Sequence, residues 1–239
     1  MDILHQPERV IIEYNGMWLV SNFEKMQLPT GWGVEQQITC VDGSTFQIYM
    51  ANMKSIFMDM IKNTDMVIFN RCKKEDPLPT YRRGIKVANQ RAEVIFEDEE
   101  GELGDIFQDE MPFDMNAPVI EILPEDYGIW FVDAMDHPEN YEGKTVKFKA
   151  RVMKPRGMGS KFFVPGRTAM TCCADDTTFL GYVCKSAYAP KLTPGEWVEV
   201  TAKVGIEKRN EYQGEEGIVL AAEHVEQCDP LEDEMVYFN

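Results

Sequence analysis

The chain has 239 residues, six cysteines and a formal net charge of −17, and its hydrophobic fraction of 44% is that of an ordinary globular protein. An excess of acid on this scale argues against nucleic acid and anionic membranes as partners, because no basic patch is present to release counterions. No run approaches the ~18 apolar residues of a membrane span, and the first residues lack the pattern of a signal peptide. We therefore expect a cytoplasmic protein with reduced thiols and no membrane insertion.

The first hundred residues alternate between strand-like and helix-like patterns. Four strands are predicted, at Arg9–Tyr14, Gln36–Asp42, Asp65–Asn70 and Ala92–Glu97. Two helices are predicted between them, at Thr45–Asn63 and Tyr81–Gln90. This alternation is typical of a parallel α/β sheet with helices on its faces. Ligands of such sheets bind outside the carboxyl ends of the strands, which would place Glu13 to Gly16, Asp42 and Asn70 to Lys73 along one edge.

An acidic stretch, 99–117, is the predicted linker between a first unit, 1–98, and a second unit, 118–239. In the second unit a short strand is expected at 120–123 and a helix at 126–135. From Gly143 the pattern changes to short alternating runs separated by turns such as Pro165-Gly166. The predicted strands are Thr145–Met153, Lys161–Val164, Arg167–Cys172, Thr178–Cys184, Glu196–Ile206 and Gly217–Val225. This arrangement predicts a small closed, all-β barrel, of the OB-like kind rather than a sandwich.

Two adjacent cysteines, Cys172 and Cys173, end one of these apolar runs. Thiolates beside carboxylates are ligands that a borderline cation such as zinc accepts. Neighbours on a regular strand point to opposite faces, so both thiols can reach one ion only at a bulge or bend. Spacing alone therefore favours buried structural cysteines, and a metal site is the alternative. Such a site would be completed by one or more of Asp175, Asp176, Cys184 and His137.

Three strand-like segments of the first half carry a family resemblance: Val10-Ile-Ile-Glu-Tyr-Asn-Gly16, Thr39-Cys-Val-Asp42 and Met66-Val-Ile-Phe-Asn70-Arg71. They resemble the carboxyl-terminal portion of a CobW-type GTPase, a family associated with metal insertion and zinc homeostasis. The resemblance implies a partial Rossmann-like P-loop GTPase sheet. It also implies that Glu13 and Gly16 correspond to residues beside the γ-phosphate, and Asn70 to the residue that reads guanine.

The chain differs from that family in the motifs that bind the nucleotide and the metal. The chain has no G-x-x-x-x-G-K-[ST] loop to cradle phosphates and no Cys-x-Cys metal motif. Arg71 and Lys73 stand where the guanine motif has Lys and Asp. The nucleotide site is therefore expected to be vestigial, so that this chain alone neither binds nor hydrolyses GTP. Hydrolysis would require a phosphate-loop segment supplied from elsewhere.

The second half carries a longer resemblance, from about Ile120 to Phe238. The matching segments are His137-Pro-Glu-Asn-Tyr-Glu-Gly-Lys144, Phe163-Val-Pro-Gly-Arg167, Met170-Thr-Cys-Cys-Ala-Asp175, Glu196-Trp-Val198 and Val236-Tyr-Phe238. They resemble the carboxyl-terminal domain of the YcgQ family, whose members are usually found with a permease and are linked to zinc uptake. The resemblance raises the metal hypothesis for Cys172 and Cys173, and it implies a permease or a metal-receiving protein as partner.

Three functions remain open at this point. The first is a metal-homeostasis accessory protein for zinc or a related metal, without GTPase activity of its own. The second is one half of a split or truncated GTP-dependent metallochaperone, and the third is a structural adaptor that binds another protein. An α/β sheet that lacks its first strand and phosphate loop leaves an open edge, so self-association is also expected.

Overall fold

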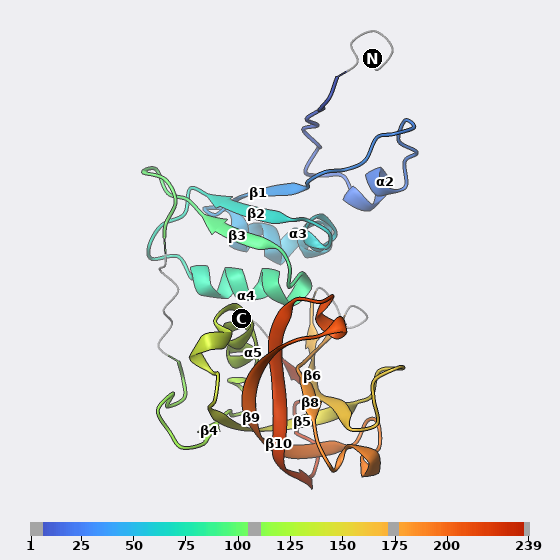
Figure 1. Cartoon of the computed structure of the whole chain (residues 1–239). Coiled ribbons are helices and arrows are strands. Elements are labelled where there is room, and N and C mark those ends of the chain that lie inside the picture. Colours follow the sequence, from blue (N-terminus) through green and yellow to red (C-terminus); the bar gives the residue numbers. More distant parts are fainter. Residues whose placement is uncertain (1–6, 105–110, 172–176, 237–239) are drawn as a thin grey trace.

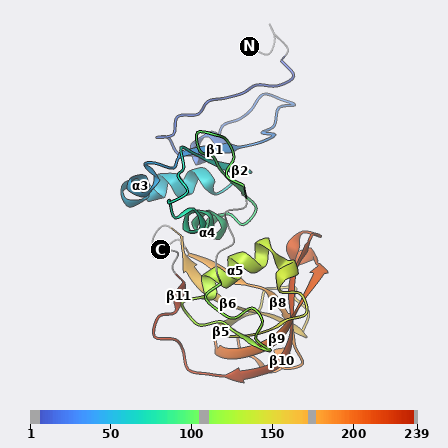
Figure 2. The same cartoon turned by 90° about the vertical axis from the view of Figure 1, so that its left-hand side faces the viewer.

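The structure is a computed structural model that describes residues 7–104, 111–171 and 177–236. It is a mixed α/β protein in which a small parallel sheet with two helices lies beside a closed β-barrel (Figure 1). Helix α4 (Leu78–Ala88) lies between the sheet and helix α5 (Tyr127–Asp136), and α5 in turn lies against the barrel (Figure 2).

The sheet consists of three parallel strands, β1 (Ile38–Asp42), β2 (Met66–Asn70) and β3 (Glu93–Phe96), in that order. Right-handed crossovers through α3 (Phe46–Ile61) and α4 are the expected way to join parallel neighbours. Alternate side chains of the strands are buried against these helices and form the first apolar core. This core includes Val41, Val67, Phe69 and Phe96 from the strands, and Phe57, Ile61, Tyr81 and Ile85 from the helices.

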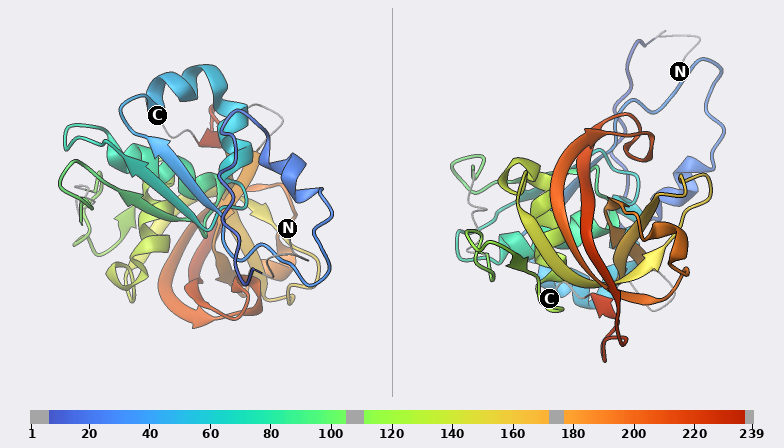
Figure 3. Two further views of the ribbon diagram at one scale, coloured as in Figure 1. Left: turned by 90° about the horizontal axis from the view of Figure 1, so that it is seen from above. Right: turned by 60° about the horizontal axis from the view of Figure 1, so that its bottom comes forward.

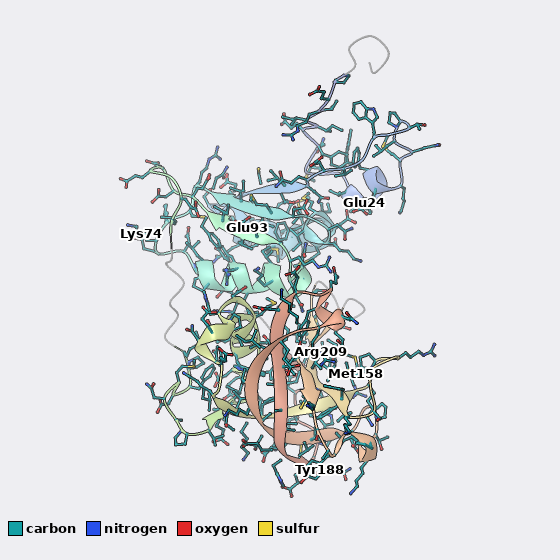
Figure 4. The ribbon with its side chains drawn as sticks, in the orientation of Figure 1. Glu24, Lys74, Glu93, Met158, Tyr188 and Arg209 are labelled. Carbon is teal, nitrogen blue, oxygen red and sulfur yellow. The ribbon has the colours of Figure 1, made fainter. Side chains whose placement is uncertain are left out.

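The expected strand at Arg9–Tyr14 is not formed. Its residues adopt no regular structure, and Ile11 is 91% exposed. A β-branched run becomes a strand only when a neighbour pairs with it, and none of the described residues does so here. The segment instead leads to the short helix α2 (Val20–Glu24), which packs beside α3. Figure 4 places Glu24 on the opposite side of the sheet from Lys74, and the carbonyl oxygen of Gly16 accepts a hydrogen bond from the Tyr49 hydroxyl of α3 at 3.3 Å.

The barrel is closed by five strands that pair in the order β5–β6–β8–β10–β9 and back to β5. Their bounds are β5 (Thr145–Met153), β6 (Phe162–Met170), β8 (Val183–Lys185), β9 (Trp197–Lys208) and β10 (Glu216–Gln227). Only the β8–β10 pair within this described ring is parallel. The long strands β9 and β10 bend around the barrel (Figure 3), and they enclose the second core with Trp130 of α5 and Phe148 of β5.

Shorter elements complete the second unit. Three further strands pair at the margins of the barrel, and three 3₁₀ turns join its strands and helix. These elements are β4 (Ile120–Glu121), β7 (Thr177–Gly181), β11 (Met235–Val236), η1 (Pro138–Asn140), η2 (Ala189–Lys191) and η3 (Asn210–Tyr212).

The sequence predicted a turn at Pro165-Gly166, and this prediction was wrong. Strand β6 runs through both residues, with Gly166 paired to Gly181 of β7. A Cβ on Gly166 would lie 2.3 Å from the carbonyl oxygen of Leu180, so only glycine lets the two backbones come this close. The predicted strand Thr178–Cys184 is divided at Tyr182 into β7 and β8.

The predicted linker is packed at both of its described ends. Leu103 belongs to the first core, and its N–H donates to the carbonyl of Phe96 at 2.8 Å. Phe113 belongs to the second core, with Met111 and Met115 packed against it. Apolar side chains at both ends of an otherwise acidic segment therefore dock it on both units.

Candidate functional site

The cysteine pair lies in the connection between β6 and β7. These strands pair from Gly166 with Gly181 as far as Met170 with Thr177. Cys172, Cys173, Asp175 and Asp176 fall between those last partners and lie outside the described residues. Strand β6 ends at Met170, before the cysteines, although the sequence predicted a strand through Cys172.

Cys184 occupies a different place. It lies on β8 opposite Phe163, is fully buried, and belongs to the barrel core. Burial raises the pKa of its thiol to about 12, which disfavours the thiolate that a metal needs. Eight positions of strand separate Phe163 from Thr171, roughly 26 Å along an extended chain. The structure therefore does not bring Cys184 to the start of the connection that carries the cysteine pair.

His137 follows the end of α5, and its Nδ1 lies 3.8 Å from a carboxylate oxygen of Glu139. Within residues 7–104, 111–171 and 177–236, no three metal-binding side chains of His, Cys, Asp or Glu come together. The candidate ligands of the cysteine pair that can be placed, Cys184 and His137, thus belong to the barrel core and the end of α5.

The carboxyl edge of the parallel sheet holds a compact polar arrangement. Arg71 follows β2 with a left-handed φ of 55°, and its guanidinium contacts the Asp42 carboxylate at 2.6 Å. A hydrogen bond from Ser44 is the main reason that the pKa of Asp42 lies below its usual value. The N–H of Gly43 donates to the carbonyl of Asn70 at 2.8 Å, while the buried side-chain oxygen of Asn70 has no hydrogen-bond partner within the described chain. Of the predicted nucleotide residues, Asn70 lies at this edge opposite Asp42, and Gly16 contacts α3 through the Tyr49 hydroxyl.

A groove of about 610 Å³ opens at one end of the barrel and was missed by sequence reasoning. One wall is the connection between β5 and β6, and the other is the turn between β9 and β10 (Figure 4, labels Met158 and Arg209). The lining residues are Pro155, Arg156, Gly157, Met158, Gly159, Phe162, Lys208, Arg209, Asn210 and Glu211. A sequence signal existed, because residues 154–161 carry three cations and no acid within a strongly acidic chain. The second wall is too distant in sequence for that signal to reveal it.

Arg209 is the most firmly held cation of the groove. Its guanidinium lies 4.4 Å from the centre of the Phe162 ring. Its Nη2 contacts the Glu211 carboxylate at 3.0 Å, and Glu207 lies 3.7 Å from Nη1. The hydrogen bond from Arg209 is also the main reason that the pKa of Glu211 lies below its usual value. A ring below and carboxylates at its edge thus fix the orientation of this guanidinium.

Fold and site together define a mixed α/β protein with a closed five-stranded barrel and an open groove between two barrel connections. Residues 102–238, more than half of the chain, match the family described as the DUF1980 C-terminal domain. The chain belongs to this family.

Other comparisons add little. No curated protein matches the chain. Among solved structures, the mitochondrial single-stranded DNA binding protein Rim1 of S. cerevisiae is 10% identical, with a TM-score of 0.22, and the match covers 36% of this chain and 95% of that one. An aspartyl tRNA synthetase from Entamoeba histolytica is 15% identical, with a TM-score of 0.26, and the match covers 49% of this chain and 27% of the synthetase. At these scores the likeness carries no weight for function. No helix within the described residues has the length and apolar character needed to cross a membrane.

Proposed function

We propose that this chain is a metal-homeostasis accessory protein that binds zinc or a related thiophilic metal and has no GTPase activity of its own. The observation that carries the proposal is the position of Cys172 and Cys173 between the paired ends of β6 and β7. Two thiols and two carboxylates fall within five consecutive residues of the sequence, and such a set offers the ligand types that zinc accepts. Asp175 is the first candidate to complete the site.

The proposal also includes the fold type of each unit. The barrel is OB-like, which is supported by its closed five-strand order and its parallel β8–β10 pair. The three-stranded sheet is the remnant of a Rossmann-like GTPase sheet, which is supported by its parallel register and its two helical crossovers. In this remnant Asp42 and Arg71 already contact each other at the edge where a nucleotide would bind. GTP is therefore not proposed as a ligand of this chain alone.

The test is a titration of the reduced chain with zinc and with copper(I) in competition with a chromophoric chelator. We expect a 1:1 complex with a dissociation constant tighter than about 1 μM, or about −8 kcal/mol. The variant Cys172→Ser, Cys173→Ser should lose this affinity and still fold. The matched control Cys40→Ser, Cys228→Ser removes two thiols outside the fully buried core and should retain it.

Two further results decide which cysteines are metal ligands. Equal and weak binding by the wild type and the Cys172→Ser, Cys173→Ser variant would show that the cysteines do not form a metal site. A loss of affinity in Cys184→Ala, measured in a variant that unfolds cooperatively, would bring Cys184 into the ligand set. We expect no such loss, because Cys184 lies beside Phe163 at the far end of β6.

A second candidate function, a structural adaptor, is favoured by a separate observation. Most of the large apolar side chains exposed in the described chain lie before residue 50, among them Ile11, Trp18 and Ile38. Clustered exposed apolar surface marks sites of protein association. A permease or a metal-receiving protein is the partner that the metal proposal requires, and a second copy of the chain is the alternative.

A further inference from the structure

The groove between the β5–β6 connection and the β9–β10 turn is independent of the cysteine pair. It is lined by three cations, Arg156, Lys208 and Arg209, and by one carboxylate, Glu211. That carboxylate is already engaged by Arg209 at 3.0 Å. In the described chain neither Arg156 nor Lys208 has a carboxylate within ion-pairing distance. The groove thus concentrates available positive charge on a protein whose net charge is −17.

The two walls offer different kinds of contact. Arg209 is held in a fixed orientation over the Phe162 ring, and its side chain is 17% exposed. A planar guanidinium held in this way can stack on a flat group and donate hydrogen bonds to an anion. Arg156 lies on the opposite wall beside Gly157, whose φ of 85° and free surroundings leave the backbone open to a ligand. Met158 and Pro155 add apolar surface to the lining of the groove.

We propose that this groove binds a small phosphate monoester that carries a flat group. The lining residues have three positive charges and one negative charge, and a phosphate monoester carries about −1.5 to −2 at neutral pH. Arg156 and Lys208 hold the phosphate from opposite walls, and Arg209 contacts the flat group. The acidic surface of the whole chain repels a polyanion over distances of about 10 Å, and a small ligand is much less affected. A nucleic-acid strand is therefore not the ligand that we infer.

The experiment is a titration of the ¹⁵N-labelled full chain, followed through the backbone amide signals of Gly157, Gly159 and Asn210. The probes are adenosine 5′-monophosphate, adenosine, inorganic phosphate and a twelve-residue oligothymidylate. We expect saturable shifts with the monophosphate, and at least tenfold weaker binding of adenosine and of phosphate. Each of Arg156→Gln and Lys208→Gln should weaken the monophosphate about fivefold. The matched control Lys191→Gln, on the exposed η2 turn outside the groove, should leave binding unchanged.

Three outcomes would overturn the proposal. Equal binding of adenosine and its monophosphate would show that the cations do not hold a phosphate. Tighter binding of the oligothymidylate, with a steep dependence on salt, would identify a nucleic-acid surface instead. Absence of shifts with the monophosphate at millimolar concentration, in a chain whose spectrum is well dispersed, would show that the groove does not bind this class of ligand. None of these results depends on zinc, so the metal proposal is tested separately.

Discussion

Arg82 of α4 and Asp136 of α5 form an ion pair that joins the two units of the chain. Lys86, one helical turn further along α4, lies 3.5 Å from the other oxygen of the same carboxylate. The Asp136 side chain is only 8% exposed, so its charge depends on these two cations for compensation. The two helices therefore meet through a shared, nearly buried carboxylate in addition to apolar packing.

Replacement of this carboxylate should destabilise the chain. Asp136→Asn removes the charge that Arg82 and Lys86 share, and we expect a loss of about 1–3 kcal/mol in the free energy of unfolding, measured by urea denaturation. The matched control is Glu139→Gln. Its carboxylate is 68% exposed and is paired only with His137 among the described residues. A change in the control as large as that in Asp136→Asn would show that the shared ion pair has no special weight.

Gly166→Ala should be strongly destabilising. A Cβ at this position would lie 2.3 Å from the Leu180 carbonyl oxygen and 2.4 Å from the Phe179 ring. Relief of this overlap requires β6 and β7 to separate, at a cost of about 2–3 kcal/mol in unfolding free energy. Gly205→Ala is the control, because on β9 the nearest atom to a new Cβ lies 3.7 Å away. Comparable urea midpoints for the two variants would contradict the close approach.

The independence of the two predicted units can be measured with two buried cysteines. Cys72 lies in the first core and Cys184 in the second. Burial is the main cause that raises their pKa values, to about 11 and about 12. In a variant that keeps only one of these two thiols, that thiol should resist labelling by a thiol-reactive probe until the unit around it unfolds. We expect Cys72 to be labelled at lower urea, because α3 and α4, the two helices that join the strands of its sheet, pack together on one face of that sheet. Identical urea dependence would show that the chain unfolds as one unit.

Acid should remove a contribution that Asp42 makes to stability. Its folded pKa lies below the usual value, chiefly through the hydrogen bond from Ser44, so the contribution is complete above the usual carboxyl pKa. It is lost as the pH falls through the lowered folded pKa. We therefore expect Asp42→Asn to reduce the difference in unfolding free energy between pH 7 and pH 3. Ser44→Ala should reduce the same difference in part. If the difference in unfolding free energy between pH 7 and pH 3 is the same in both variants as in the wild type, the pKa of Asp42 is not lowered in the folded protein.

Self-association should depend on the exposed segment near the start of the described chain. Ile11 and Ile12 are 91% and 58% exposed, and the β1 edge of the sheet has no described strand beside it. We expect Ile11→Lys, Ile12→Lys to weaken association at least tenfold in sedimentation equilibrium, because two charges replace apolar contact surface. Val119→Lys, Leu123→Lys alters exposed apolar residues of the second unit and should have little effect. A wild-type chain that is monomeric at every concentration would rule out the association.

Much of the architecture followed from local pattern. Thr145–Met153 alternates so regularly that β5 has the predicted bounds, and β1, β2 and β3 lie within their predicted runs. The errors came from information that is not local. Arg9–Tyr14 has strand composition but pairs with no strand of the described chain, and Gly166 marks a close contact with β7 rather than a turn. The groove combines residues about fifty positions apart, so no local motif could have revealed it.

A single buried side chain, Arg167 on β6, ties together the beginning and the end of the second unit. The Arg167 guanidinium donates to the carbonyl oxygen of Pro124, near the entry to the barrel. It also donates to the carbonyl oxygens of Asp233 and Met235, near the last described strand, both at 3.0 Å. Entry and exit of the barrel are therefore neighbours. A short artificial link could join them, and new termini could be opened in an exposed turn such as the one at Gln213-Gly214. The same geometry makes this unit suitable for insertion, as an intact cassette, into a surface loop of another protein.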